Sequence, residues 1–293
     1  MRRSIKTARA ASLLLLVAGL ATLGMTSVAS AHTGNFAKFD YCPSTTAGVK
    51  KCLVSVTTGG KVVLGKKNVP IVNPVTLQGG VGVPNEATGV ATFFGATNGV
   101  TLSKAPQPVP GGLAGIIPPE SSPQIVKDAI KFFFENGLTG VNSTLELARP
   151  ASEIRVNEEA LLYEEGTALK MPVKVHLENP FLGSNCYVGS SSNPIIWNLT
   201  SGKTSPPAGT EPIFGTFGFG SFIEEEIFHI SGNELVENNW SAPGATGCGG
   251  FLLELLINPI INASVGIPAA AGKNTAVLKN TIDLATAVSV NNH

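Results

Sequence analysis

Histidine offers this chain the widest range of chemistry, and only four are present, His32, His176, His229 and His293. Cleavage by a signal peptidase after Ala31 would give His32 a free α-amino group beside its imidazole, a pair of nitrogens that can chelate Cu(II). A useful copper site would also need a second histidine, either His176 or His229. A solvated N-terminus is the simpler interpretation of His32, so we predict no metal site and no cofactor.

A hydrolytic triad would have to use His176 or His229 as its base. Both lie between apolar neighbours in runs typical of strands, where a histidine is ordinarily just a sheet residue. The sequence contains no G-x-S-x-G, H-E-x-x-H, P-loop or G-x-G-x-x-G pattern. We therefore assign no catalytic residue.

Carboxylates occur in three clusters, Glu158-Glu159, Glu164-Glu165 and Glu224-Glu225-Glu226. A glycosidase needs two carboxylates about 5 to 10 Å apart. Alternate side chains of a strand share a face, so a strand through the third cluster would bring Glu224 and Glu226 together. A solvated acidic surface is the simpler interpretation of all three clusters.

The four cysteines, Cys42, Cys52, Cys186 and Cys248, form an even set that predicts two disulfides in an exported chain. Three pairings are possible. We favour Cys42–Cys52, which joins neighbours in the sequence, and Cys186–Cys248, which closes a long loop. No C-x-x-C pattern is present and no histidine lies near a cysteine pair, so a zinc site is not expected.

The first 31 residues have the three parts of a secretion signal. Arg2, Arg3, Lys6 and Arg9 form a basic start, residues 11–20 are almost entirely apolar, and Ala29-Ser30-Ala31 is a small-residue cleavage site. We predict a signal peptide over 1–31, recognised through Ala29 and Ala31, and a mature chain beginning at His32. The general secretory and twin-arginine routes both remain open.

The predicted mature chain is mildly acidic and sparsely charged. Of 20 Lys and Arg the signal removes four, which leaves 16 against 20 Asp and Glu, a formal charge of −4. This balance excludes nucleic acid and anionic membrane surfaces as electrostatic partners. The apolar run 251–261 is short and interrupted by Glu254, Asn258 and Pro259, so we predict a buried helix there and no transmembrane segment in the mature chain.

Short β-branched runs punctuated by Gly and Pro predict a strand-rich fold. We expect a hairpin of 52–57 and 61–64 turning at 58–60, and further strands at 69–72, 89–94, 100–102, 141–147, 153–156, 168–177, 195–200, 211–219, 222–230, 234–236 and 275–288. A single turn or two of helix is expected within 157–165. The fold class is α+β, mostly antiparallel β and sandwich-like, with one or two attached helices. We expect one mature domain over 32–293.

A Pro-rich segment, 103–123, is expected to be a surface loop that leads into a helix. Ser122 can cap this helix, Pro123 suits its first turn and Gly137 can end it. Its buried face would share helical spacing, at Ile125, Val126, Ala129, Ile130, Phe133 and Phe134.

Four stretches carry a resemblance: Tyr41-Cys42-Pro43, 75–80, 177–187 and 243–248. With these stretches the chain resembles uncharacterised exported proteins of high-GC Gram-positive bacteria. The resemblance covers most of the mature chain and includes all four cysteines. It implies export and a single folded unit, and it implies no activity, cofactor or catalytic residue.

These observations favour a secreted, extracellular or cell-envelope protein that is non-catalytic and either structural or binding, with envelope components as its partners. The alternative is a secreted hydrolase or a copper-dependent oxidase that acts on envelope or polysaccharide material. A deep cleft that joins His176 or His229 to two acids would favour the enzyme. The absence of such a cleft would favour the binding protein.

Overall fold

The computed structural model describes residues 31–113, 115, 120–128 and 139–293, and every strand pairing among them is antiparallel. The strands are β1 (Lys51–Leu64), β2 (Lys67–Pro70), β3 (Val75–Val81), β4 (Val90–Gly95), β5 (Pro106–Pro108), β6 (Asn142–Leu147), β7 (Arg155–Asn157), β8 (Leu169–Glu178), β9 (Tyr187–Val188), β10 (Ile195–Leu199), β11 (Phe219–Ile223), β12 (Ile227–Glu237), β13 (Ala245–Thr246) and β14 (Thr275–Thr286). The helices are η1 (Gly34–Phe39), η2 (Ala151–Glu153), α2 (Glu158–Tyr163), α3 (Gly250–Val265) and α4 (Ala287–Asn292). The predicted class, mostly antiparallel β with attached helices, is confirmed.

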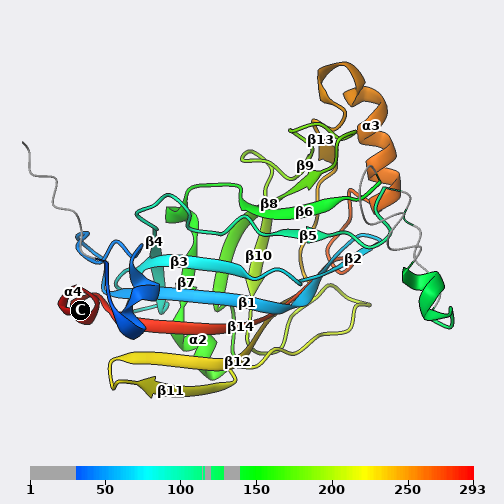
Figure 1. Cartoon of the computed structure of the whole chain (residues 1–293). Coiled ribbons are helices and arrows are strands. Elements are labelled where there is room, and N and C mark those ends of the chain that lie inside the picture. The colour runs from blue at the N-terminus through cyan, green and yellow to red at the C-terminus, as the bar shows by residue number, and fades with distance from the viewer. Residues whose placement is uncertain (1–30, 114, 116–119, 129–138) are drawn as a thin grey trace, which may run out of the picture. The chain divides into compact units, whose positions relative to one another are not determined.

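The strands form one continuous sheet in the order β11-β12-β14-β1-β3-β4-β7-β8-β6-β5, with β2, β9, β10 and β13 paired beside this path (Figure 1). Strand β4 pairs with β3 on one side and β7 on the other, so it joins two halves of the sheet. The main apolar core contains Leu53 and Leu77 from the first half and Met171 and Val173 from the second. The two halves therefore face one another across the core, as in a sandwich.

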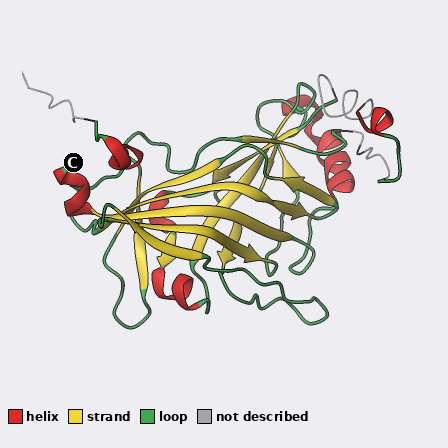
Figure 2. Ribbon diagram, turned by 60° about the horizontal axis from the view of Figure 1, so that its bottom comes forward, coloured by secondary structure: helices red, strands yellow, loops and turns green. Residues whose placement is uncertain are grey.

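A second, smaller core covers the outer face of β1 and β14. Phe36 and Phe39 from η1 and Val290 from α4 are buried there against Val54 of β1. Both ends of the unit His32–His293 thus pack on the same sheet face, and Figure 2 shows the helices attached at the margins of the strands.

The four cysteines form the two disulfides that the sequence favours. Cys42–Cys52 joins the segment after η1 to β1, and Cys186–Cys248 joins the segment before β9 to the segment before α3. Disulfides form and persist in oxidising compartments, which fits a protein that folds outside the cytosol.

The expected hairpin at 58–60 is wrong, because β1 runs unbroken from Lys51 to Leu64. The pairing of β1 with β14 shifts register between Thr57 and Gly59, so Gly59 and Gly60 belong to a bulged strand and not to a turn. A Cβ on Gly60, whose φ is +102°, would lie 2.0 Å from the carbonyl oxygen of Val277. The chain turns instead just after β1, at Gly65, and Leu64 pairs with Lys67 across this turn.

Two expectations for the Pro-rich region and its helix need correction. Residues 106–108 form β5, paired with β6, so 103–123 is not loop throughout. A helix does begin after Pro123, but Ile125 and Val126 are 79% and 41% exposed and do not form a buried face. The other expected face residues, Ala129, Ile130, Phe133 and Phe134, lie outside the described residues.

The acidic triplet does not lie in a strand. Glu224 and Glu225 have left-handed φ values of 53° and 60° and, with Glu226, form the turn between β11 and β12. The expected sharing of a strand face by Glu224 and Glu226 is therefore wrong. The strands expected at 211–219 and 100–102 reduce mostly to single bridges, such as Leu77–Leu102 and Thr216–Glu234.

Candidate ligand-binding site

A cavity of about 120 Å³ lies in the main core, with strands of both halves of the sheet around it. One water molecule needs about 10–15 Å³ on the same measure, so the cavity has room for a small organic molecule. Its wall is predominantly apolar and includes Val62, Leu64, Val69, Ile71, Val75, Leu77, Leu145, Leu169, Met171, Val175, Leu177 and Trp197.

The cavity follows from the alternation of side chains along the strands. In β1 the lining residues are Ser55, Thr57, Val62 and Leu64, and in β8 they include Val175 and Leu177. Alternate residues point to one face of a strand, which explains the spacing of two within each group. Small side chains at Ser55, Thr57, Ala105 and Ser143 occupy positions where larger ones would fill the space.

Two buried polar atoms of lining residues have no hydrogen-bond partner among the described residues. They are the Oδ1 of Asn280, a residue 4% exposed, and the Nε1 of Trp197, a residue 1% exposed. Asn280 lies directly opposite Thr57 in the pairing of β1 with β14. An unsatisfied buried polar atom costs about 1–3 kcal/mol. Both atoms are closed off from solvent, so their cost falls on the stability of the fold.

Lys67 is the only charged residue among the described residues that line the cavity. Its Nζ has no ion pair or hydrogen bond among the described residues, and burial lowers the pKa of this ammonium. A Cβ on Gly115 would come within 2.9 Å of this Nζ, so a glycine at 115 leaves room for the charge. Ser264 and Val265 of α3 line the cavity as well. The site thus combines an apolar wall with one cation that has no partner in the described part of the chain.

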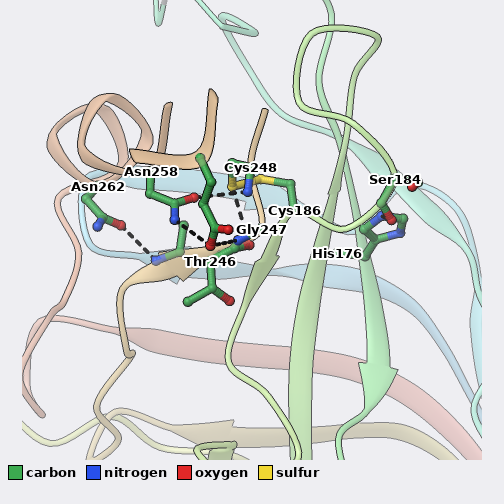
Figure 3. The surroundings of a disulfide bond; sticks show 10 residues. His176, Ser184, Cys186, Thr246, Gly247, Cys248, Asn258 and Asn262 are labelled. Carbon is green, nitrogen blue, oxygen red and sulfur yellow. Dashed lines mark hydrogen bonds between the residues drawn. A yellow bond between two sulfur atoms is a disulfide. The ribbon is translucent and has the colours of Figure 1, made fainter. Parts of the chain in front are cut away.

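Helix α3 lines the cavity with its C-terminal part. It attaches to the sheet through one polar side (Figure 3). The Oδ1 of Asn262 accepts from the N–H of Ala245 at 2.7 Å, and the Oδ1 of Asn258 accepts from the N–H of Cys248 at 3.0 Å. Glu254 Oε1 accepts from the N–H of Gly247 at 2.8 Å. These three side chains follow at intervals of four residues, which places them along one side of the helix.

The expectation that α3 is a buried helix is wrong. Phe251 is 96% exposed, Leu252 86% and Leu255 89%, whereas Ile261 and Val265 are buried. An apolar run of this length is equally typical of a core helix and of a helix that contacts a hydrophobic partner, so composition cannot distinguish them. Among the described residues, no helix has the length and apolar content to cross a membrane.

The structure does not bring the candidate histidines together. His32 bonds through its backbone N and its Nδ1 to Asp40 Oδ1, each at 2.8 Å. His176 bonds through Nε2 to the carbonyl oxygen of Ser184 at 3.1 Å and stacks on Tyr187. Within the described ranges, no group of three or more His, Cys, Asp or Glu is placed to hold a metal ion.

His229 lies on the outer face of the sheet, with an aspartate and a serine on the neighbouring strands. Its Nδ1 lies 2.8 Å from Asp283 Oδ1, and Ser221 is its cross-strand partner in β11. The row Ser221–His229–Asp283 spans three adjacent strands in the order of a hydrolytic triad. Lys38 Nζ pairs with the second oxygen of Asp283 at 3.0 Å, so the same contacts also make an ordinary surface ion-pair network.

Sequence reasoning missed Lys67, Asn280 and Trp197. Each has an ordinary local sequence, and each matters only because distant strands bring it to one cavity. The chain matches no family model, no curated protein and no solved structure.

Proposed function

We propose that the protein is a non-catalytic exported binding protein that holds the apolar part of a small amphipathic molecule in the cavity of its β-sheet. The observation that carries this proposal is the cavity itself, which is apolar over most of its wall and bordered by Lys67, a cation with no partner among the described residues. Binding pockets for small molecules are mostly apolar with a few polar groups that fix orientation.

The wall chemistry indicates which ligand fits. Each methylene moved from water into the cavity contributes about 0.8 kcal/mol, so a short alkyl chain gains several kcal/mol. A carboxylate or phosphate head group beside Lys67 would form a charge-assisted hydrogen bond. The cavity lining among the described residues contains no Asp, Glu or His, which disfavours acid–base catalysis inside it.

Titration with N-phenyl-1-naphthylamine, a neutral apolar dye that fluoresces when it leaves water, tests the cavity. We expect saturable binding to the wild-type protein and at least a tenfold weaker affinity for Ala105→Phe and for Leu145→Trp, because both changes fill the cavity. Ala47→Phe adds an aromatic side chain at an exposed position outside the cavity and is the matched control.

Two results would overturn the cavity proposal. One is the absence of saturable dye binding to the wild-type protein. The other is unchanged binding in both filled variants, each shown to be folded by its urea unfolding curve.

Localisation and partners are part of the same proposal. The disulfides, the signal-like residues 1–31 and the resemblance to exported proteins support a location outside the cytosol, in the cell envelope or the medium. Envelope membranes are a ready source of amphipathic ligands.

A second candidate function, a secreted hydrolase, is favoured by the row Ser221–His229–Asp283. A fluorophosphonate probe, which labels activated serines covalently, tests it directly. Labelling of the wild-type protein that is absent from Ser221→Ala and retained in the neighbouring Ser231→Ala would establish an activated serine. Absent labelling of the wild-type protein, or labelling that survives Ser221→Ala, would eliminate this row as a hydrolytic triad.

A further inference from the structure

Every exposed residue of α3 is apolar. These residues are Phe251, Leu252, Leu253, Leu255, Leu256, Pro259, Ile260 and Ala263. Phe181, 59% exposed, lies near the start of the helix, where the carbonyl oxygen of Leu182 accepts from the N–H of Gly249. Contiguous exposed apolar patches on this scale mark interaction surfaces.

The width of this surface identifies the kind of partner. At 3.6 residues per turn, the exposed positions from Phe251 to Ala263 spread over an arc of about 200°. A helix packed against another protein element typically buries a stripe of about 100°. A protein groove, or α3 of a second copy, would therefore leave about half of these side chains in water. Fluid lipid hydrocarbon has no fixed shape, so it can cover the whole arc of about 200° and not only a stripe of about 100°.

The charges of α3 fit a lipid environment as well. Glu254 is its only ionisable residue, and hydrogen bonds from the N–H of Gly247 and the amide of Asn258 lower the pKa of this carboxyl group. This carboxylate therefore belongs to the anchored side of the helix. Lys66 Nζ donates to the carbonyl oxygen of Ala263 at 3.4 Å, near the C-terminal end. The charged groups thus lie beside the body of the protein, and the apolar arc is free of charge.

The attachment of α3 holds this arc in place. The Cys186–Cys248 disulfide ends two residues before the helix, and Asn258 and Asn262 bond to the backbone around β13 (Figure 3). A surface fixed before binding loses less conformational entropy when it binds.

We propose that α3 is a membrane-docking element, which inserts residues 251–256 into the interfacial region of an uncharged lipid bilayer. The driving force is burial of apolar side chains and not attraction between charges, in keeping with a mature chain of formal charge −4. Docking needs no ligand in the cavity, so it can succeed or fail independently of the proposed binding function.

Flotation with phosphatidylcholine vesicles, using protein whose start at His32 is verified by intact mass, tests the proposal. We expect the wild-type protein to float with the vesicles equally at low and high salt. The double variant Phe251→Ser/Leu255→Ser should partition at least about tenfold more weakly, because two exposed apolar side chains are lost from the interface. The control Phe219→Ser/Val288→Ser removes one aromatic and one aliphatic side chain, 69% and 70% exposed, from other parts of the surface and should float like the wild type.

A second variant reports insertion even if the double variant is unstable. Phe251→Trp should be quenched by lipids with brominated acyl chains, since the native Trp197 and Trp240 are only 1% and 3% exposed. The proposal is overturned if the wild-type protein does not float, if it floats only with anionic vesicles at low salt, or if position 251 is not quenched. A lipid-free dimer that Phe251→Ser/Leu255→Ser abolishes would assign the surface to a second copy instead.

Discussion

Lys67→Met separates the apolar and electrostatic parts of the proposed ligand site. Methionine keeps an unbranched apolar stem and removes only the charge. In the free protein the Lys67 ammonium makes no ion pair or hydrogen bond among the described residues, so its loss breaks no contact there. Stability should be unchanged or slightly raised, since burial disfavours the charged form.

The effect should appear only with an anionic ligand. A hydrogen bond to a charged group contributes about 1.5–3 kcal/mol, so Lys67→Met should weaken binding of a carboxylate amphipath by about 10- to 150-fold. The same substitution should change the affinity for a neutral analogue by less than about threefold, because the apolar wall is intact.

Displacement of the naphthylamine dye by dodecanoate and by dodecanol measures both affinities. Lys66→Met is the matched control, because Lys66 is the preceding residue and its Nζ bonds to Ala263 outside the cavity. An equal loss for acid and alcohol, or an equal loss in Lys66→Met, would refute the assignment of the head group to Lys67.

The pH dependence gives an independent check on the same residue. Burial lowers the Lys67 pKa below its usual 10.5. Only the protonated ammonium attracts a carboxylate, so affinity for dodecanoate should be highest below this pKa and fall as the pH rises through it. Lys67→Met should abolish that fall, and dodecanol should show none with either protein.

Three further predictions concern stability and processing. Replacing Cys186 and Cys248 by serine should lower the free energy of unfolding by about 4 kcal/mol, and replacing Cys42 and Cys52 should lower it by about 3 kcal/mol. The first disulfide costs more to lose because it closes a loop of 62 residues, whereas the second closes one of 10. Urea unfolding compares the two variants, and equal losses would contradict the loop-length argument. Asn280→Leu should raise the free energy of unfolding by about 1 kcal/mol in the same assay, since it removes a buried oxygen that has no partner among the described residues. A lower free energy of unfolding would mean that this oxygen accepts a hydrogen bond in the native protein. The intact mass of secreted protein should correspond to a start at His32, and a retained signal would contradict the cleavage site.

Much of the fold was predictable because strands leave local marks. Most expected strands are present, and the short acidic helix α2 begins where Asn157 accepts a hydrogen bond from the N–H of Ala160. The errors fall where a distant partner decides the local conformation. Gly59 and Gly60 are typical of a turn, yet the approach of Val277 in β14 makes them part of a bulged strand. Pro106–Pro108 pairs with β6 although its composition is typical of a loop.

The candidate site was far less predictable than the fold. The sequence of a single strand does not show that Ser55, Thr57 and Ser143 leave a cavity. The space depends on how both halves of the sheet pack together. The same holds for α3, whose exposed leucines are indistinguishable by type from core leucines. Its three anchoring side chains at intervals of four were visible, but their partners around Cys248 were not.

Because α3 both lines the cavity and carries the exposed apolar arc, docking and ligand transfer should be coupled. Ser264 and Val265 contact the cavity, while Phe251 and Leu255 would contact lipid. A ligand released at the docked surface would enter the bilayer without crossing water.

Transfer of dansyl-undecanoate from the wild-type protein to vesicles should therefore accelerate as vesicle concentration rises. In Phe251→Ser/Leu255→Ser the rate should be slower and independent of vesicle concentration, since release into water then limits it. A concentration-independent rate in the wild-type protein would show that the two surfaces of α3 act separately, even if each proposal holds alone.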